Sequence, residues 1–187
     1  MRKFIGILFI SLFFLTGCGN AMKTPTKAVE QYLNKYQNLD GEVMAQLDSV
    51  ISSDVSMSDE QKKDYKDLII NQYKNLSYKI VNENIMNDTA EVEVEIEVLD
   101  YASSIGEAKI YYTNHLDEFN DEEKKDTEDE DVDDLSSFID YKIKSMKDVN
   151  NTRKETIVFS LNKVDKEWVV DDLNDLDIEK LHGLYEG

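Results

Sequence analysis

The chain has 187 residues, of which 41% are hydrophobic and 10% aromatic, a composition typical of one folded core rather than of a disordered chain. Its formal net charge of −19 argues against nucleic acid as a partner and against docking on anionic lipid head groups, because both need a basic patch. The single cysteine excludes an intramolecular disulfide.

The start of the chain is built like a secretory signal sequence. A short cationic segment, Met1–Lys3, precedes an apolar run, Phe4–Leu15, which is too short to span a bilayer comfortably. The run ends in Leu15-Thr16-Gly17-Cys18, which resembles the lipobox of bacterial lipoproteins. This resemblance implies cleavage between Gly17 and Cys18, and a thioether-linked diacylglycerol on Cys18.

The lipobox resemblance also implies a location. A protein that carries acyl chains on Cys18 is anchored in the cell membrane on its extracytoplasmic face, and a composition rich in Lys, Asn and Ile favours a Gram-positive type of source. We expect a signal peptide over residues 1–17, a tether over 18–23 and one folded domain over 24–187. The tether reaches about 15–20 Å when extended, and we expect the acidic body to stand off the membrane.

The first third of the domain shows helical periodicity. Thr24 followed by Pro25 is typical of a helix start, and Ser58 and Gln61 are spaced as a capping box. Apolar residues recur every three or four positions after each start, with an interruption at Asp40-Gly41. The expected helices cover Thr24–Leu39, Val43–Ile51 and Ser58–Leu76.

Period-two alternation predicts two β-hairpins. In Ala90–Val98, apolar residues alternate with four glutamates, which is tolerated in an antiparallel sheet with one solvated face. Asn87-Asp88 and Asp165-Lys166 are the expected turns, and Trp168 is an expected core residue. The expected strands cover Tyr78–Asn84, Ala90–Val98, Arg153–Leu161 and Glu167–Leu173.

The segment between the hairpins is acidic and helical in pattern. Helical spacing is present over Ile105–Phe119 and Leu135–Met146, and Asp117–Asp134 holds twelve acidic residues and two lysines. This run lacks the spacing and the glycine of an EF-hand, so we expect a solvated loop there. The alternative is a segment that orders on calcium and makes the protein calcium-responsive.

Helices, a hairpin, further helices and a second hairpin indicate an α+β fold. The order of elements resembles the NTF2-like (cystatin-related) domains of small lipoproteins, with Thr24–Leu47 as the opening helices and Lys166–Leu173 as the final strand with its tryptophan. The resemblance implies N-terminal helices packed on a curved antiparallel sheet of about four strands. Ala102–Val149 is then an acidic helical insertion between the two hairpins.

The sequence contains no recognisable catalytic, metal or cofactor motif. The two histidines are His115, expected on the flank of a helix, and His182, expected as a cationic cap near a helix C-terminus. Some NTF2-like enzymes place an acid and a tyrosine in a conical pocket. The groups that could supply this chemistry here are Asp100, Tyr101, Tyr111 and Tyr112.

These observations favour a non-enzymatic binding or interaction module at the cell envelope, held by the lipid on Cys18 and needing no cofactor. The expected partner is an envelope protein with a basic surface, which complements the net charge of −19, or a small ligand in the concave sheet. The alternatives are the NTF2-like pocket enzyme with Asp/Tyr chemistry and the calcium-responsive surface protein.

Overall fold

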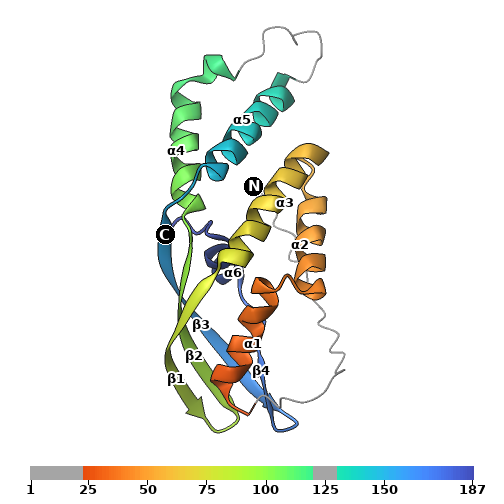
Figure 1. The fold of residues 1–187 in the computed structure, drawn as a ribbon. Coiled ribbons are helices and arrows are strands. Elements are labelled where there is room, and N and C mark those ends of the chain that lie inside the picture. Colours follow the sequence, from red (N-terminus) through yellow and green to blue (C-terminus); the bar gives the residue numbers. More distant parts are fainter. Residues whose placement is uncertain (1–22, 120–129) are drawn as a thin grey trace.

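A computed structural model describes residues 23–119 and 130–187. The predicted signal peptide, the cleavage site at Gly17 and Cys18, and most of the acidic run lie outside these residues. In the described part, six α-helices and a four-stranded antiparallel sheet form the predicted α+β fold (Figure 1). The elements are α1 (Pro25–Gln37), α2 (Gly41–Ser53), α3 (Asp59–Asn75), β1 (Ser77–Met86), β2 (Thr89–Leu99), α4 (Tyr101–Asn114), the 3-10 turn η1 (Leu116–Glu118), α5 (Glu130–Lys147), β3 (Thr152–Val164), β4 (Glu167–Val170) and α6 (Asp175–His182).

The predicted helix starts are present with their capping bonds. The Thr24 hydroxyl accepts a hydrogen bond from the Lys27 amide at 3.2 Å and thereby satisfies a free N–H at the start of α1. In α3, Ser58 Oγ accepts from the Gln61 amide at 3.2 Å, and Gln61 Oε1 accepts from the Ser58 amide at 2.9 Å. The capping box expected from the sequence is therefore confirmed.

The sheet has the strand order β1-β2-β3-β4, so each hairpin pairs its own strands and β2 joins β3 at the centre. The register places Val92 opposite Phe159 and Val94 opposite Ile157, and these four side chains are buried. The four glutamates of β2 face away from the helices and are exposed or half-buried. The predicted sheet with one wet face is confirmed.

The main core lies between the sheet and α1, α2, α3 and α6, and α1 runs across the strands in Figure 1. Its helical residues project at three- and four-residue intervals and its strand residues at every second position, as the sequence patterns predict. The buried members include Val29, Leu33, Tyr36, Leu47, Ile51, Ile69, Tyr73, Val92, Val94, Ile96, Ile157, Phe159, Leu161 and Trp168.

A second, smaller core holds the α4–α5 insertion against α3. Its buried residues are Leu68, Tyr101, Ile139, Ile143 and Met146. At its edge, Gln61 Nε2 donates to the Ser136 carbonyl oxygen at 3.0 Å and to the Asp140 carboxylate at 2.8 Å. Gln61, the second member of the capping box, therefore also fixes the position of α5.

Several boundaries differ from those expected. Leu39 lies outside α1 with a φ of 53°, because the helix has already ended at Gln37. β4 ends at Val170 rather than at residue 173, because its backbone pairing with β3 closes at the Asp171 amide, which donates to the Ser160 carbonyl oxygen at 2.9 Å. The α5 helix begins at Glu130, so the last part of the acidic run is helical rather than a loop.

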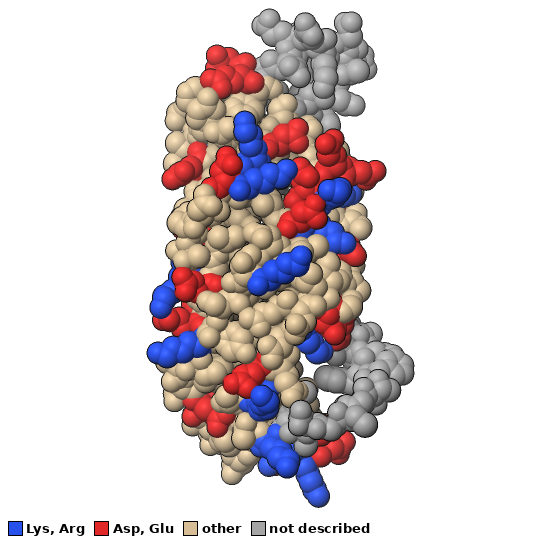
Figure 2. Space-filling model, viewed as in Figure 1, with Lys and Arg blue, Asp and Glu red and all other residues tan. Residues whose placement is uncertain are grey.

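The molecule has two distinct ends (Figure 1). The start of α1, the β1–β2 turn and the β3–β4 turn lie at one end, and the α4–α5 insertion projects at the other. The face seen in Figure 2 carries interspersed acidic and basic side chains, with lysines gathered at the lower end. No helix within residues 23–119 and 130–187 is long and apolar enough to cross a membrane.

Candidate functional site

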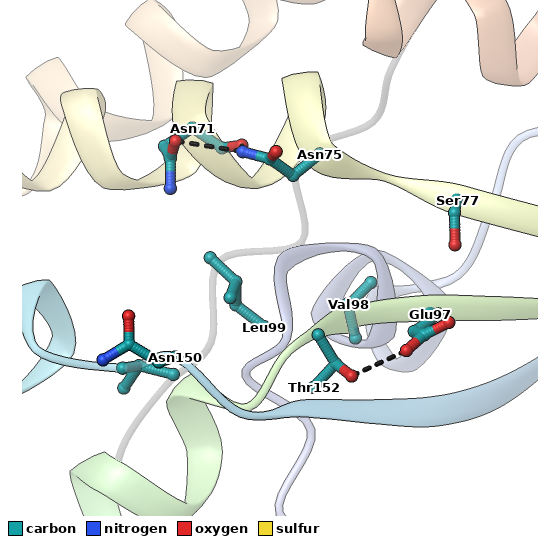
Figure 3. Close-up of a pocket in the computed structure, with 9 residues that line it drawn as sticks. Asn71, Asn75, Ser77, Glu97, Val98, Leu99, Asn150 and Thr152 are labelled. Carbon is teal, nitrogen blue, oxygen red and sulfur yellow. Dashed lines mark hydrogen bonds between the residues drawn. The ribbon is translucent and has the colours of Figure 1, made fainter.

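A polar pocket of about 430 Å³ opens where α3 passes into β1 (Figure 3). The end of α3 forms one wall, and the end of β2 and the start of β3 form the other. Most lining side chains are amides or hydroxyls, and the floor is apolar. The lining residues are Asn71, Asn75, Ser77, Glu97, Val98, Leu99, Val149, Asn150 and Thr152.

Hydrogen bonds between the lining residues set the positions of their side chains. Asn75 Nδ2 donates to Asn71 Oδ1 at 3.0 Å, and Thr152 Oγ1 donates to Glu97 Oε1 at 2.7 Å (Figure 3). Asn150 Nδ2 donates to the Asp148 carbonyl oxygen at 2.9 Å, so its amide oxygen is the group left to accept a hydrogen bond. Each wall thus presents hydrogen-bonding groups whose positions are fixed by these bonds.

The pocket is electrostatically suited to a ligand that donates hydrogen bonds. The carboxylate of Glu97 lies on one wall, and the other wall is the C-terminus of α3, where the last backbone carbonyls carry partial negative charge. Amide oxygens from Asn71 and Asn150 add further acceptors. The arrangement is chemically suited to groups that donate hydrogen bonds, such as an amine, an amide or a polyhydroxy group.

The alternative enzyme residues do not meet in one place. Asp100 caps α4, accepting from the Ser103 amide at 3.2 Å, and its Oδ1 lies 3.4 Å from Arg153 Nη1. The Tyr101 hydroxyl is buried and donates to the Leu68 carbonyl oxygen at 3.2 Å. Both groups therefore act within the framework of the fold.

Tyr111 and Tyr112 lie near the far end of α4. Tyr111 stacks on Tyr141 of α5 with ring centroids 5.1 Å apart, and its hydroxyl donates to Glu118 at 2.7 Å. Tyr112 packs on Phe138 at 4.5 Å. These rings join α4 to α5, and neither adjoins the polar pocket.

The expected role of His182 is wrong. Its Nε2 lies 2.7 Å from the Tyr73 hydroxyl, and its ring packs on the Tyr73 ring with centroids 5.5 Å apart. Burial lowers the pKa of His182 to about 4, so the ring is neutral at pH 7 and cannot act as a cationic cap. Burial also raises the pKa of Tyr73, which keeps its hydroxyl protonated.

His115 has the packing role that its place on a helix flank predicts. His115 ends α4, where Nδ1 lies 2.9 Å from the Tyr111 carbonyl oxygen and the ring stacks on Tyr111 at 4.0 Å, as a packing residue on a helix flank would. Within the described ranges, no group of three or more His, Cys, Asp or Glu side chains is arranged to hold a metal ion. Most of Asp117–Asp134, expected as a solvated loop with a calcium-responsive segment as the alternative, lies in the gap between those ranges.

The pocket residues were missed by the sequence analysis. Asn71 and Asn150 are isolated exposed polar residues, and nothing in their local sequence distinguishes them from surface residues elsewhere. The pairing of β2 with β3, which sets Glu97 opposite Lys154 and beside Thr152, builds one wall of the pocket, and the contact of α3 with β2 places the other wall. A reliable signal would have required the order of the strands.

Comparisons with known proteins give limited results. No protein-family model matches the chain, and no match is found among curated proteins. Among solved structures, it is similar to a Bacillus subtilis (subsp. subtilis str. 168) protein, ycdA, which is described as a lipoprotein, at 17% identity and a TM-score of 0.44. The match covers 88% of this chain and 56% of that chain, so this chain spans about half the length of ycdA.

Proposed function

We propose that the protein is a lipid-anchored binding module on the extracytoplasmic face of a bacterial cell membrane. The segment Leu15–Cys18 supports the anchor, with residues 1–17 as the signal peptide, 18–23 as the tether and 24–187 as the folded domain. The NTF2-like resemblance belongs to this proposal and rests on the order of elements. In this proposal Cys18, the single cysteine, carries the covalently bound lipid.

The observation that carries the binding role is the pocket between α3 and β3. Its groups accept and donate hydrogen bonds, and its lining comes from α3, β1, β2, β3 and the loop between α5 and β3. A pocket of about 430 Å³ is in the size range of small-ligand sites. An acceptor-rich pocket and a net charge of −19 both favour a cationic or donor-rich partner, such as an envelope protein with a basic surface.

The separate positions of the candidate acid and tyrosine groups support a binding role without catalysis. A general acid or base must lie within hydrogen-bond reach of the group on which it acts. Asp100 is engaged with Ser103 and Arg153, and Tyr101 with Leu68, so neither is presented to a shared cavity in the described structure. The proposal therefore assigns recognition, rather than turnover, to this chain.

The anchor is tested by metabolic labelling of the full chain with an alkyne fatty acid in a Gram-positive host. The wild type should incorporate the label, and Cys18→Ala should lose it entirely, because the thioether needs the thiol. Asn20→Ala is the matched control and should keep the label. Labelling of Cys18→Ala, or none of the wild type, would sink the lipoprotein claim.

The binding role is tested by photocrosslinking in cells. A benzophenone side chain placed at Asn150 should give a discrete adduct, whose mass distinguishes a small ligand from a protein partner. The control position is Val55, which is 98% exposed on the loop between α2 and α3 and does not line this pocket. Adducts of equal yield at both positions, or none at Asn150, would contradict a site in the pocket.

A further inference from the structure

Two β-turns and the start of α1 form a single end of the molecule, here called the turn end, defined by residues 23–27, 83–89 and 162–167. The Lys163 amide donates to the Asp88 carbonyl oxygen at 2.8 Å and joins the two turns directly. The amide and hydroxyl of Thr26 donate to Glu83 Oε2 at 2.8 and 2.6 Å, which ties α1 to β1. The turn end is therefore one connected surface, at the lower edge of Figure 1.

This surface carries apolar side chains where polar ones are usual. Met86 and Val164 each occupy the last strand position before a two-residue turn, paired with Thr89 and Glu167. Their exposed fractions are 52% and 53%, and that of neighbouring Ile85 is 50%. A single exposed apolar residue is ordinary, but two at equivalent positions on turns that a hydrogen bond joins give this end a partly apolar character.

The charges at the turn end differ from those of the whole chain. Lys27, Lys163 and Lys166 are exposed there. Among the described residues, neither Lys163 nor Lys166 forms an ion pair, and Lys163 Nζ lies 5.4 Å from the centre of the Trp168 ring. With Lys23, these lysines offset the acids Glu83, Asp88, Asp165 and Glu167, so the turn end is formally neutral while the chain carries −19.

The length of the tether determines what this surface can reach. Thr24, the N-cap of α1, belongs to the turn end, and five residues separate it from Cys18. Five extended residues span about 15–20 Å. A lipid on Cys18 therefore holds the turn end within reach of the lipid head groups, and a short link makes even a weak contact effectively intramolecular.

We propose that the turn end docks on the same bilayer that holds the anchor. Met86 and Val164 enter the head-group region, and Lys163 and Lys166 contact lipid phosphates. The inference rests on the lipid anchor proposed above, and it adds a direct protein–membrane contact and an orientation. In that orientation the α4–α5 insertion points away from the membrane.

The test uses the full lipidated chain, reconstituted in vesicles of neutral and anionic phospholipids. Because the thiol of Cys18 is blocked by the lipid, Met86→Cys and Val164→Cys each provide one site for a bimane fluorophore. Nitroxide-labelled lipids should quench both labels several-fold more strongly than a label at Ile110→Cys, a position on α4 that is 65% exposed. Equal, weak quenching at all three positions would overturn the docking proposal.

The design separates failure of the docking from failure of the anchor. Wild-type protein that does not float with the vesicles would overturn the anchor and the docking together. Protein that floats but shows no preferential quenching at Met86→Cys and Val164→Cys would overturn the docking alone. Thermal unfolding of each labelled variant verifies that the fold is intact, and the half-exposed positions leave the core untouched.

Discussion

Tyr73 and His182 are 109 residues apart in the sequence, yet their polar atoms meet at 2.7 Å beside the main core. Tyr36 packs edge-on against Tyr73 with ring centroids 5.1 Å apart, and the Tyr32 hydroxyl lies 3.3 Å from that of Tyr36. Burial raises the pKa of both Tyr32 and Tyr36, so these hydroxyls stay neutral. The four rings form a neutral polar seam between α1, α3 and α6.

The seam predicts a pH dependence of stability. The folded protein keeps His182 neutral down to about pH 4, whereas the unfolded chain binds a proton at the ordinary pKa of 6.5. The stabilisation is therefore complete above pH 6.5 and is lost as the pH falls toward 4, by an amount on the order of 2–3 kcal/mol.

Urea unfolding at several pH values between 7 and 4 measures this loss against His182→Gln. The variant keeps a hydrogen-bonding group near Tyr73 but cannot titrate in this range. The wild type should lose more unfolding free energy on acidification than the variant does, whatever the many carboxylates add to both. Parallel curves would show that His182 is not the titrating group.

Among the helices, α6 ends at a residue that contacts the start of α4. Gly183 ends α6 with a φ of 70°, and its carbonyl oxygen accepts from the Ala102 amide at 2.8 Å, so the end of α6 is fixed to the start of α4. A Cβ on Gly183 would collide with the Leu99 carbonyl oxygen. Only glycine satisfies both the left-handed backbone and this close approach.

Gly183→Ala should therefore lower the unfolding free energy by about 2 kcal/mol or more. Gly106→Ala is the matched control, because Gly106 lies inside α4 and a Cβ there meets nothing within 4 Å. That change should raise the unfolding free energy by about 0.5–1 kcal/mol. Chemical denaturation of both variants measures the two changes in unfolding free energy, which should have opposite signs. An unchanged unfolding free energy for Gly183→Ala would contradict the close contact with Leu99.

On the scale of the whole molecule, the two cores are unequal. Among the residues that the structure describes, twenty buried residues form the main core, whereas five hold the α4–α5 insertion against α3. The stability of a region follows the apolar surface that it buries, so the insertion is the part expected to open first.

Native-state hydrogen exchange can resolve this difference. Amides of α4 and α5 should exchange at a lower opening free energy than those of β2 and β3, with the C-terminal half of α5 more protected because Ile143 and Met146 lie there. Uniform protection across all elements would indicate a single cooperative unit instead.

Local pattern was enough to predict most elements, because their signals are short-range. The Thr24 cap, the Ser58–Gln61 box and the alternation in β2 each act within a few residues, and all three appear as expected. The boundaries that moved depend on distant contacts. The end of β4 depends on how far its backbone pairs with β3, up to the bond from the Asp171 amide to the Ser160 carbonyl oxygen, and no local pattern reveals that pairing.

The candidate site was beyond local reasoning for the same reason. Asn71 and Asn150 lie on opposite walls of the pocket, and they come together only because α3 packs against β2 and α5 while β2 pairs with β3. The place of His182 at a helix end predicts a charged side chain. Its burial against Tyr73 depends on the packing of α6 against α3, which the local sequence does not show. Chemistry that arises from tertiary contact has no counterpart in local sequence.

The bulge in β1 has a consequence for a population of such molecules. β1 is an edge strand of ten residues, and its register shifts between Ile80 and Asn82. Copies held in one membrane plane, as proposed above, would meet edge to edge far more often than in dilute solution. The irregular edge, with the charge of Lys79 beside it, opposes strand pairing between neighbours and so favours separate molecules over growing lateral sheets.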